Sequence, residues 1–214
     1  MPARPRKKLR EITRRKPQRA NGRETVATIF EATARILQSE GRTGLNTNRI
    51  AEKAGISIGA LYGYFPNKQA IVLAMARHEL DLMRDRVLAA LVHDRADETD
   101  PIRRAVRALI AGYTARGKVR RILMETLFAH GGSEEMARPV SEIADALLAN
   151  PQQLFPGGAA PSRIALYVLT RAVDSVIRTA TYENVEFLRG RAFEGELVRL
   201  VYGYLGAAPS AQNS

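Results

Sequence analysis

The chain has 214 residues, 45% of them hydrophobic and none of them cysteine. This composition is enough for a folded core and excludes wholesale disorder, disulfides and thiolate metal sites. Lysine and arginine number 33 against 22 aspartates and glutamates, for a formal net charge of +11. No apolar run approaches the roughly 18 residues that span a bilayer, and no apolar segment follows the N-terminal charges, so we expect a cytoplasmic protein that does not associate with membranes.

The positive charge is concentrated at the N-terminus. The first twenty residues contain nine basic side chains and one acid, Glu11, which accounts for +8 of the formal +11. With three prolines and little apolar content, residues 1–22 are expected to form a disordered basic arm. Such an arm either keeps the protein in solution or binds a polyanion such as DNA.

The next segment predicts three helices separated by tight turns. Residues 23–40 place apolar side chains along one face at the 3.6-residue helical period. Asn46 is expected to cap a second helix over about 47–54. Ser57 is expected to cap a third, which ends before Pro66 because a residue preceding proline avoids helical geometry. This order of elements is typical of a helix-turn-helix.

Helical patterns continue to the end of the chain, and strand signals are scarce. Asn67 can cap a long helix over about 68–91. Prolines and glycines interrupt the pattern at 150–162. Further helices are predicted over 101–115, 117–130, 133–149, 163–184 and 191–205. The sequence therefore predicts an all-α fold.

The stretch GISIGALYGYFPNK, residues 55–68, places Tyr62 and Tyr64 among small residues. In a helix-turn-helix the second helix lies in the major groove, where small residues allow close approach and each phenol can donate to a phosphate oxygen. Lys68 lies in the first turn of the following helix, beside free backbone N–H groups, which suggests a phosphate clamp. The alternative is that the two tyrosines form an aromatic plug between helices.

Residues 47–72, TNRIAEKAGISIGALYGYFPNKQAIV, carry a family resemblance together with the amphipathic helix at 25–39 and the GRTGLN that precedes Thr47. They resemble the DNA-binding domain of the TetR family of bacterial transcriptional repressors. The resemblance spans residues 23–75, about a quarter of the chain; the remainder fits the family only in length and helix count.

The resemblance implies DNA contacts of three kinds. Thr47 and Asn48, at the start of the second helix, are expected to contact phosphates or bases. The positions that enter the major groove are Ser57, Ile58, Gly59 and Ala60. The phosphate-contacting positions are Tyr62, Tyr64 and Lys68.

Gly63 departs from the pattern, because some family members carry a larger, base-reading side chain there. Apart from Asn48 and Ser57, few side chains on this surface can hydrogen-bond to bases, while Ile58 and Ala60 can contact a thymine methyl. We therefore expect recognition to depend on phosphate contacts, DNA shape and the basic arm, whose arginines can enter a narrow A/T-rich minor groove.

The last two helices, 163–184 and 191–205, are the most apolar, so this surface is either core or interface. The resemblance implies that they pair with their symmetry mates in a homodimer that reads a palindromic operator on double-stranded DNA. It also implies that the middle helices enclose an inducer pocket.

Candidate pocket residues are polar or aromatic groups within apolar helical stretches: Tyr113, Glu125, His130, Tyr167, Asp174 and Arg178. Each has an ordinary structural explanation as well. Asp174 and Arg178 have the spacing of a surface ion pair, as do Arg121 and Glu125. His130 stands at a helix C-terminus, where the helix dipole favours a cation.

Together these features predict a sequence-specific DNA-binding regulator, a repressor released from its operator by a small-molecule inducer. A helix-turn-helix domain over 23–68 is joined by a long helix to an effector-binding and dimerisation domain over 69–206, followed by a disordered tail over 207–214. The residues do not distinguish a repressor from an activator. The alternative is a ligand-independent, weakly selective architectural DNA-binding protein.

An enzyme fits the sequence poorly. The three histidines are dispersed, and the chain has no metalloprotease, P-loop or dinucleotide-binding motif. A hydrolase hidden in the helical part is the remaining enzymatic alternative. We expect no catalytic residues, no cofactor and no metal.

Overall fold

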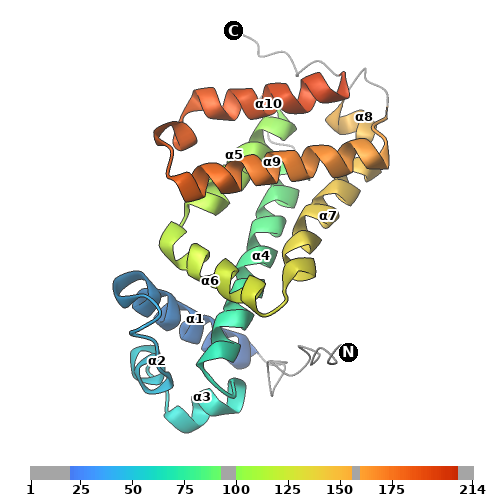
Figure 1. Cartoon of the computed structure of the whole chain (residues 1–214). Coiled ribbons are helices and arrows are strands. Elements are labelled where there is room, and N and C mark those ends of the chain that lie inside the picture. Colours follow the sequence, from blue (N-terminus) through green and yellow to red (C-terminus); the bar gives the residue numbers. More distant parts are fainter. Residues whose placement is uncertain (1–19, 93–99, 156–159, 207–214) are drawn as a thin grey trace, which may run out of the picture.

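The computed structural model describes residues 20–92, 100–155 and 160–206, and every element in these ranges is helical (Figure 1). The all-α prediction is therefore confirmed. Most of the predicted basic arm, and all of the predicted tail over 207–214, lie outside the described residues. The first helix, α1 (Ala20–Glu40), begins before the predicted position 23, so the last three residues assigned to the arm are helical.

The N-terminal domain consists of α1, α2 (Thr47–Ala54) and α3 (Ile58–Tyr64). Asn46 caps α2, because its side-chain oxygen accepts from the Arg49 amide at 2.9 Å. Ser57 caps α3 by accepting from the Ala60 amide at 3.1 Å. Gly55 between the two helices has φ 68°, in the left-handed region that favours glycine. The predicted helix-turn-helix is thus formed by local interactions at its predicted positions.

The connector α4 (Lys68–Val92) belongs to two hydrophobic cores. Its first half, through Leu80, packs with α1, α2 and α3, and its second half packs against α5. The first core also contains residues of α6, among them Val119, Leu123 and Leu127. The N-terminal core therefore extends past position 68, where the sequence suggested a domain boundary.

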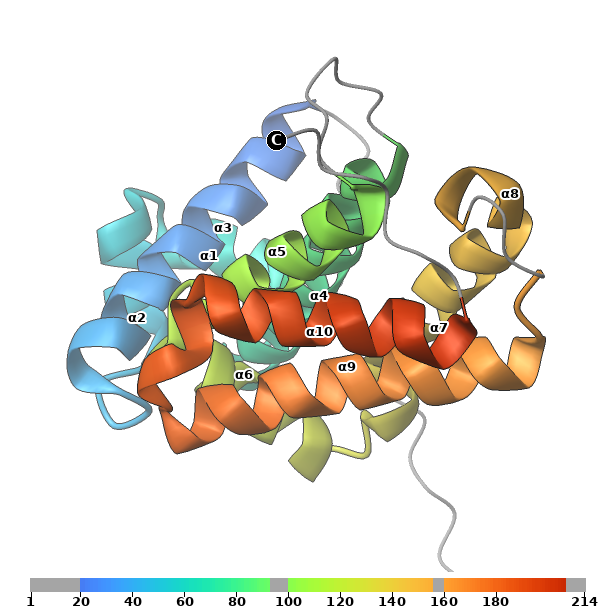
Figure 2. The same ribbon diagram turned by 90° about the horizontal axis from the view of Figure 1, so that it is seen from above.

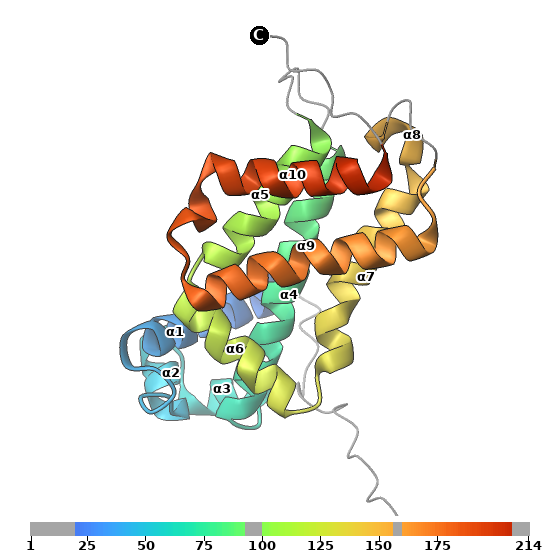
Figure 3. The same ribbon diagram turned by 45° about the horizontal axis from the view of Figure 1, so that its top comes forward.

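The rest of the chain is a layered set of helices. In order they are α5 (Pro101–Thr114), α6 (Gly117–Ala129), α7 (Ser133–Ala149), α8 (Pro151–Leu154), α9 (Arg163–Glu183), the 3₁₀ helix η1 (Glu186–Arg189) and α10 (Arg191–Leu205). Only the short α8 and η1 were not expected. Helices α9 and α10 run side by side across the others and form one outer face (Figures 2 and 3). No helix in the described ranges has the length and apolar character needed to cross a membrane.

A polar cluster joins α5 to α10. Asp100, which caps α5, accepts a hydrogen bond from the Tyr202 hydroxyl at 2.5 Å. Glu194, only 8% exposed, accepts from Arg107 at 2.9 Å and from Arg103 at 3.2 Å. The hydrogen bond from Arg107 lowers the pKa of Glu194, and Arg103 adds to this effect, while burial opposes it.

We expect Glu194→Gln to lower the free energy of unfolding by about 1–3 kcal/mol at pH 7, because two guanidiniums lose their anionic partner. The pKa of Glu194 is lower in the folded than in the unfolded chain, so its stabilisation is present above the unfolded pKa and is lost as the pH falls through the folded pKa. The difference between variant and wild type should therefore narrow below pH about 4. Urea denaturation at pH 7 and at acid pH measures it.

The matched control is Glu196→Gln on the same helix, where the carboxylate is exposed and pairs with Arg199. This change should alter stability by less than about 0.5 kcal/mol at either pH. An equal cost for Glu194→Gln at both pH values would show that its charge contributes nothing.

Candidate DNA-binding surface and ligand cavity

The start of α3 presents a small, exposed surface. All four residues predicted to enter the major groove are exposed: Ser57, Ile58, Gly59 and Ala60. Gly63, further along α3, has no atom within 4 Å of where a Cβ would stand. Packing within the described chain therefore does not require glycine at position 63.

Tyr62 connects α3 to the start of α2. Its hydroxyl lies 3.2 Å from the Thr47 hydroxyl, and the side chain is 43% exposed. Asn48, the next residue of α2, is also exposed. Three predicted DNA-contacting residues are thus brought together at one edge, with the Tyr62 phenol held in place and still accessible.

Tyr64 differs from Tyr62, because its side chain is half-buried and packs against the N-terminal core. The aromatic-plug interpretation therefore describes the ring of Tyr64 and does not describe Tyr62. A tyrosine in this position can still present its hydroxyl at the surface while the ring fixes the end of α3.

Lys68 has a structural contact that the sequence did not predict. Its ammonium donates to the backbone carbonyl of Leu45 at 3.0 Å, which joins the start of α4 to the loop before α2. A lysine ammonium has three N–H donors, so two remain for another acceptor. The residue is exposed and lies next to the N-terminus of α4.

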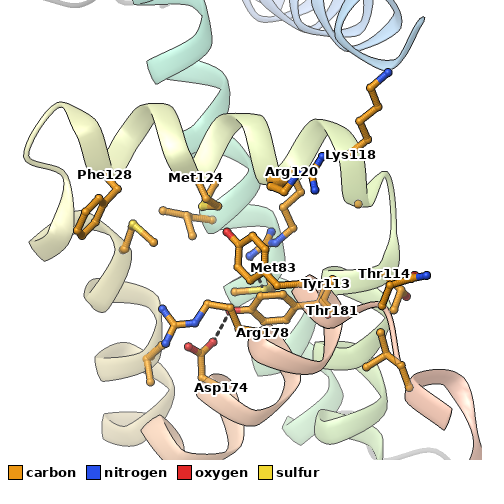
Figure 4. A pocket seen from close by; sticks show the side chains of 18 of the residues that line it. Met83, Tyr113, Thr114, Lys118, Arg120, Met124, Phe128, Asp174, Arg178 and Thr181 are labelled. Atoms are coloured by element: carbon orange, nitrogen blue, oxygen red, sulfur yellow. Dashed lines mark hydrogen bonds between the residues drawn. The ribbon is translucent and has the colours of Figure 1, made fainter. Parts of the chain in front are cut away.

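A cavity of about 810 Å³ lies among α4, α5, α6, α7, α9 and η1 (Figure 4). Three of the six predicted pocket residues line it, namely Tyr113, Asp174 and Arg178. The Tyr113 hydroxyl donates to Asp174 at 2.6 Å. Burial, and then the charge of Asp174, raise the pKa of Tyr113, so the phenol stays protonated and keeps this bond.

The structure does not bring the other three predicted residues to this cavity. Glu125 is exposed and accepts a hydrogen bond from Arg42 at 3.1 Å. His130, at the end of α6, contacts Gln69 at the start of α4. Tyr167 is exposed near the start of α9, where the guanidinium carbon of Arg171 lies 4.0 Å from the centre of its ring. None of the three is among the residues that line the cavity.

Sequence reasoning missed the basic character of the cavity. Besides Arg178, its lining includes Lys118, Arg120, Arg121, Arg171 and Arg189, against the two carboxylates of Asp174 and Glu186. A signal was available in α6, where Arg120 occurs among the buried Val119, Leu123 and Leu127. A charged residue within such an apolar pattern is unusual unless it has a partner or a ligand.

Helix α6 also contacts the DNA-binding domain. The Lys118 ammonium donates to the carbonyl of Gln38 at 2.7 Å, and Arg42 donates to the carbonyl of Ile122 at 3.2 Å. Arg116, just before α6, pairs with a carboxylate of α1 at 2.8 Å. The same helix therefore lines the cavity and holds the end of α1. Within the described ranges, no cluster of side chains has the composition of a metal site.

Two family models match the chain. "Bacterial regulatory proteins, tetR family" matches residues 29–75, and "Tetracyclin repressor-like, C-terminal domain" matches residues 99–205. The chain is also similar to the HTH-type transcriptional regulator BetI of Burkholderia thailandensis, with 30% identity over 113 residues. That similarity covers 53% of this chain and 55% of the relative, so it extends over about half the length of each protein.

Solved structures show the same fold at low sequence identity. A TetR family regulator from Marinobacter aquaeolei VT8 is 19% identical with a TM-score of 0.58, covering 89% of this chain and 98% of its own. The fatty acid degradation regulator FadR from Bacillus halodurans is 16% identical with a TM-score of 0.60, covering 85% and 94%. One family model covers the helix-turn-helix, and the other, at residues 99–205, covers half of the whole chain. This protein therefore belongs to the TetR family of DNA-binding bacterial transcriptional regulators.

Proposed function

We propose that this protein is a repressor that binds a palindromic operator as a homodimer and leaves it when a small-molecule inducer occupies the 810 Å³ cavity. The observation that carries the proposal is the double role of α6, which lines the cavity and contacts α1. DNA binding is assigned to residues 23–68, and effector binding and dimerisation to residues 69–206. The family consists of transcriptional regulators, and we propose no catalytic role.

Coupling between the cavity and the DNA-binding surface has a direct path. On one face of α6, Leu123 and Leu127 are fully buried in the N-terminal core. On another, Met124 and Phe128 line the cavity. The connector α4 contributes Met83 to the same lining. A ligand that shifts α6 or α4 therefore also moves the helices that support α3.

Release requires that the inducer bind the DNA-incompetent state more tightly than the DNA-bound state. The coupling free energy in such systems is typically about 1–3 kcal/mol. The hydrogen bonds that join α6 to the end of α1 are partly exposed, so their rearrangement is compatible with a coupling of this size.

DNA contacts are proposed for the nine residues named from the family resemblance. Thr47, Tyr62, Tyr64 and Lys68 would hold phosphates, and Asn48 and the start of α3 would face the bases. The α3 surface is small and offers few hydrogen-bonding side chains. Phosphate contacts, DNA shape and the basic arm would therefore supply much of the affinity.

The outer face of α9 and α10 supports a homodimer. Its exposed apolar side chains are Ile164, Val168, Val176, Leu200 and Tyr204. An apolar surface of this extent on one chain is typical of an interface, and a second copy provides a matching face. In the two-fold dimer the two α3 helices would lie one DNA turn apart, ~34 Å, or a multiple of it.

Footprinting of the full-length protein on its own upstream DNA, with random competitor DNA at near-physiological salt, tests the proposed function. We expect a short protected palindrome. Removing residues 2–19 should weaken binding and reduce the dependence of log K on log salt by up to several units, because as many as about nine basic side chains are lost. Diffuse protection that competitor DNA abolishes would favour the architectural alternative.

Tyr62→Phe should weaken operator binding at least about tenfold, because each protomer loses a hydrogen bond to a phosphate. The unfolding temperature should change little, since the side chain is 43% exposed and its hydroxyl bonds to the Thr47 hydroxyl. Fluorescence anisotropy with operator DNA at fixed salt measures the effect. Tyr167→Phe removes a hydroxyl from an exposed tyrosine of α9, far along the chain from α3, and is the matched control. Equal affinities for the two variants would refute the role of Tyr62.

Val176→Glu should convert the dimer to a monomer, because it buries a carboxylate in the proposed interface. Val176 is 42% exposed in the single chain, so the protomer itself should stay folded. The control is Val92→Glu at the end of α4, where the valine is 70% exposed and belongs to neither helix of the proposed interface. Sedimentation at micromolar concentration distinguishes the species. A wild-type monomer under these conditions would contradict the proposed dimer.

A further inference from the structure

We propose that the cavity is an anion site in which Arg120 binds the acidic group of an amphipathic organic acid. The proposal rests on the proposed inducer function and specifies the chemical class of the inducer. Its basis is the state of Arg120, the distribution of the other charges around the cavity, and the apolar surface beside them (Figure 4).

Arg120 is a buried charge that forms no ion pair with a carboxylate in the described part of the chain. The side chain extends from α6 toward Tyr113, and the residue is only 6% exposed. Its Nε is buried with no hydrogen-bond partner, and one terminal nitrogen contacts only the sulfur of Met83 at 3.2 Å. The guanidinium carbon lies 4.5 Å from the centre of the Tyr113 ring. These contacts are weak substitutes for the water that burial removes.

A charge buried in this way is costly unless an anion compensates it. The planar guanidinium carries five N–H donors in a fork that matches a carboxylate or sulfonate. Because Arg120 lines an open cavity, the missing anion can come from solvent as part of a ligand. This is the arrangement expected of a ligand anchor and differs from that of a structural ion pair.

The neighbouring cations reinforce the positive potential. Arg171 donates to the Ser141 hydroxyl at 3.0 Å, and Arg178 lies 3.4 Å from the Ser175 hydroxyl. Neither forms an ion pair with a carboxylate of the described residues. Of the two carboxylates in the lining, Asp174 already accepts from Tyr113 and Glu186 lies on η1. The six cations of the lining thus exceed its carboxylates by four.

The remaining lining favours an apolar ligand body. Met124, Phe128, Met136 and Val140 contribute apolar side chains around the basic group. A smaller cavity of about 70 Å³, with an almost wholly aliphatic lining, shares Met83 with the first one and extends toward α10. A ligand with its acidic group at Arg120 can place a hydrocarbon or aryl part against these surfaces, which identifies the class as amphipathic anions.

The test compares two fluorescent probes that share an arylamine skeleton. One is 8-anilino-1-naphthalenesulfonate, which carries a sulfonate, and the other is uncharged N-phenyl-1-naphthylamine. In titrations of the full-length protein, we expect the sulfonate to bind at least about tenfold more tightly. Arg120→Met should weaken sulfonate binding about 10- to 100-fold, the range for loss of a charge-assisted hydrogen bond, and leave the neutral probe unaffected.

Two further variants separate a ligand anchor from a structural residue. Arg35→Met removes the same charge from an exposed position of α1 outside the cavity and should weaken sulfonate binding less than about threefold. Arg120→Lys should bind the sulfonate with intermediate affinity, because it keeps the charge and loses the fork. The unfolding temperature of Arg120→Met without probe should equal or exceed that of wild type, since methionine replaces an uncompensated buried charge. A lowered unfolding temperature together with unchanged sulfonate affinity would overturn the proposal.

The outcomes also separate this proposal from the proposed function. Sulfonate binding through Arg120 that leaves operator DNA bound would support the anion site and count against release by anionic inducers. Equal affinity for both probes, or equal effects of Arg120→Met and Arg35→Met, would overturn the anion site. In that case a neutral inducer could still release the operator, and the footprint would remain the test of function.

Discussion

The arrangement of the rest of the molecule depends on the position of helix α6, because the buried side of this helix belongs to the hydrophobic core of the DNA-binding domain. One face completes the hydrophobic core of the DNA-binding domain through Val119, Leu123 and Leu127. The opposite side is a wall of the cavity. Close-packed interiors do not deform continuously, so a helix held in this way moves together with the core that it completes. The boundary between the reading domain and the effector domain is therefore a shared helix, with no flexible linker at that point.

The buried charge of Arg120 follows from the same arrangement. A methionine or leucine at this position would pack with its apolar neighbours at lower cost in desolvation. An arginine at this position has an explanation if an anion binds in the cavity. Burial of the unpaired guanidinium lowers the stability of the free protein, and a bound anion would offset that cost and so bind more tightly. The contact of Arg120 with Met83 of α4 adds a second connection, since an anion that draws the guanidinium away from the sulfur alters the packing of α6 on the connector. Arg120 would then both bind the anion and connect α6 to the connector α4.

Much of the fold could be predicted from the sequence because its signals are local. Asn46, Ser57 and Asn67 each cap a helix a few residues away, and the apolar period gives the helix ends to within a few residues. The cavity depended on which face of each helix turns inward, and spacing alone does not decide this. Asp174 and Glu125 both have an arginine one helical turn away. Only Asp174 faces the cavity, because Tyr113 from another helix meets it there.

The small α3 surface has a consequence for how a ligand could act on DNA binding. Phosphate contacts carry little sequence information in themselves, but they fix the position of each reading head on the duplex. In the proposed dimer, selectivity for one palindrome would then depend strongly on the separation of the two α3 helices. Few side chains on α3 can contact bases, so base contacts could not hold a misaligned α3 on the DNA. A modest displacement of α4 and α6 would misalign Tyr62 and Lys68 with their phosphates in both protomers at once. Weak base readout would thus make the protein more dependent on the geometry that the cavity controls.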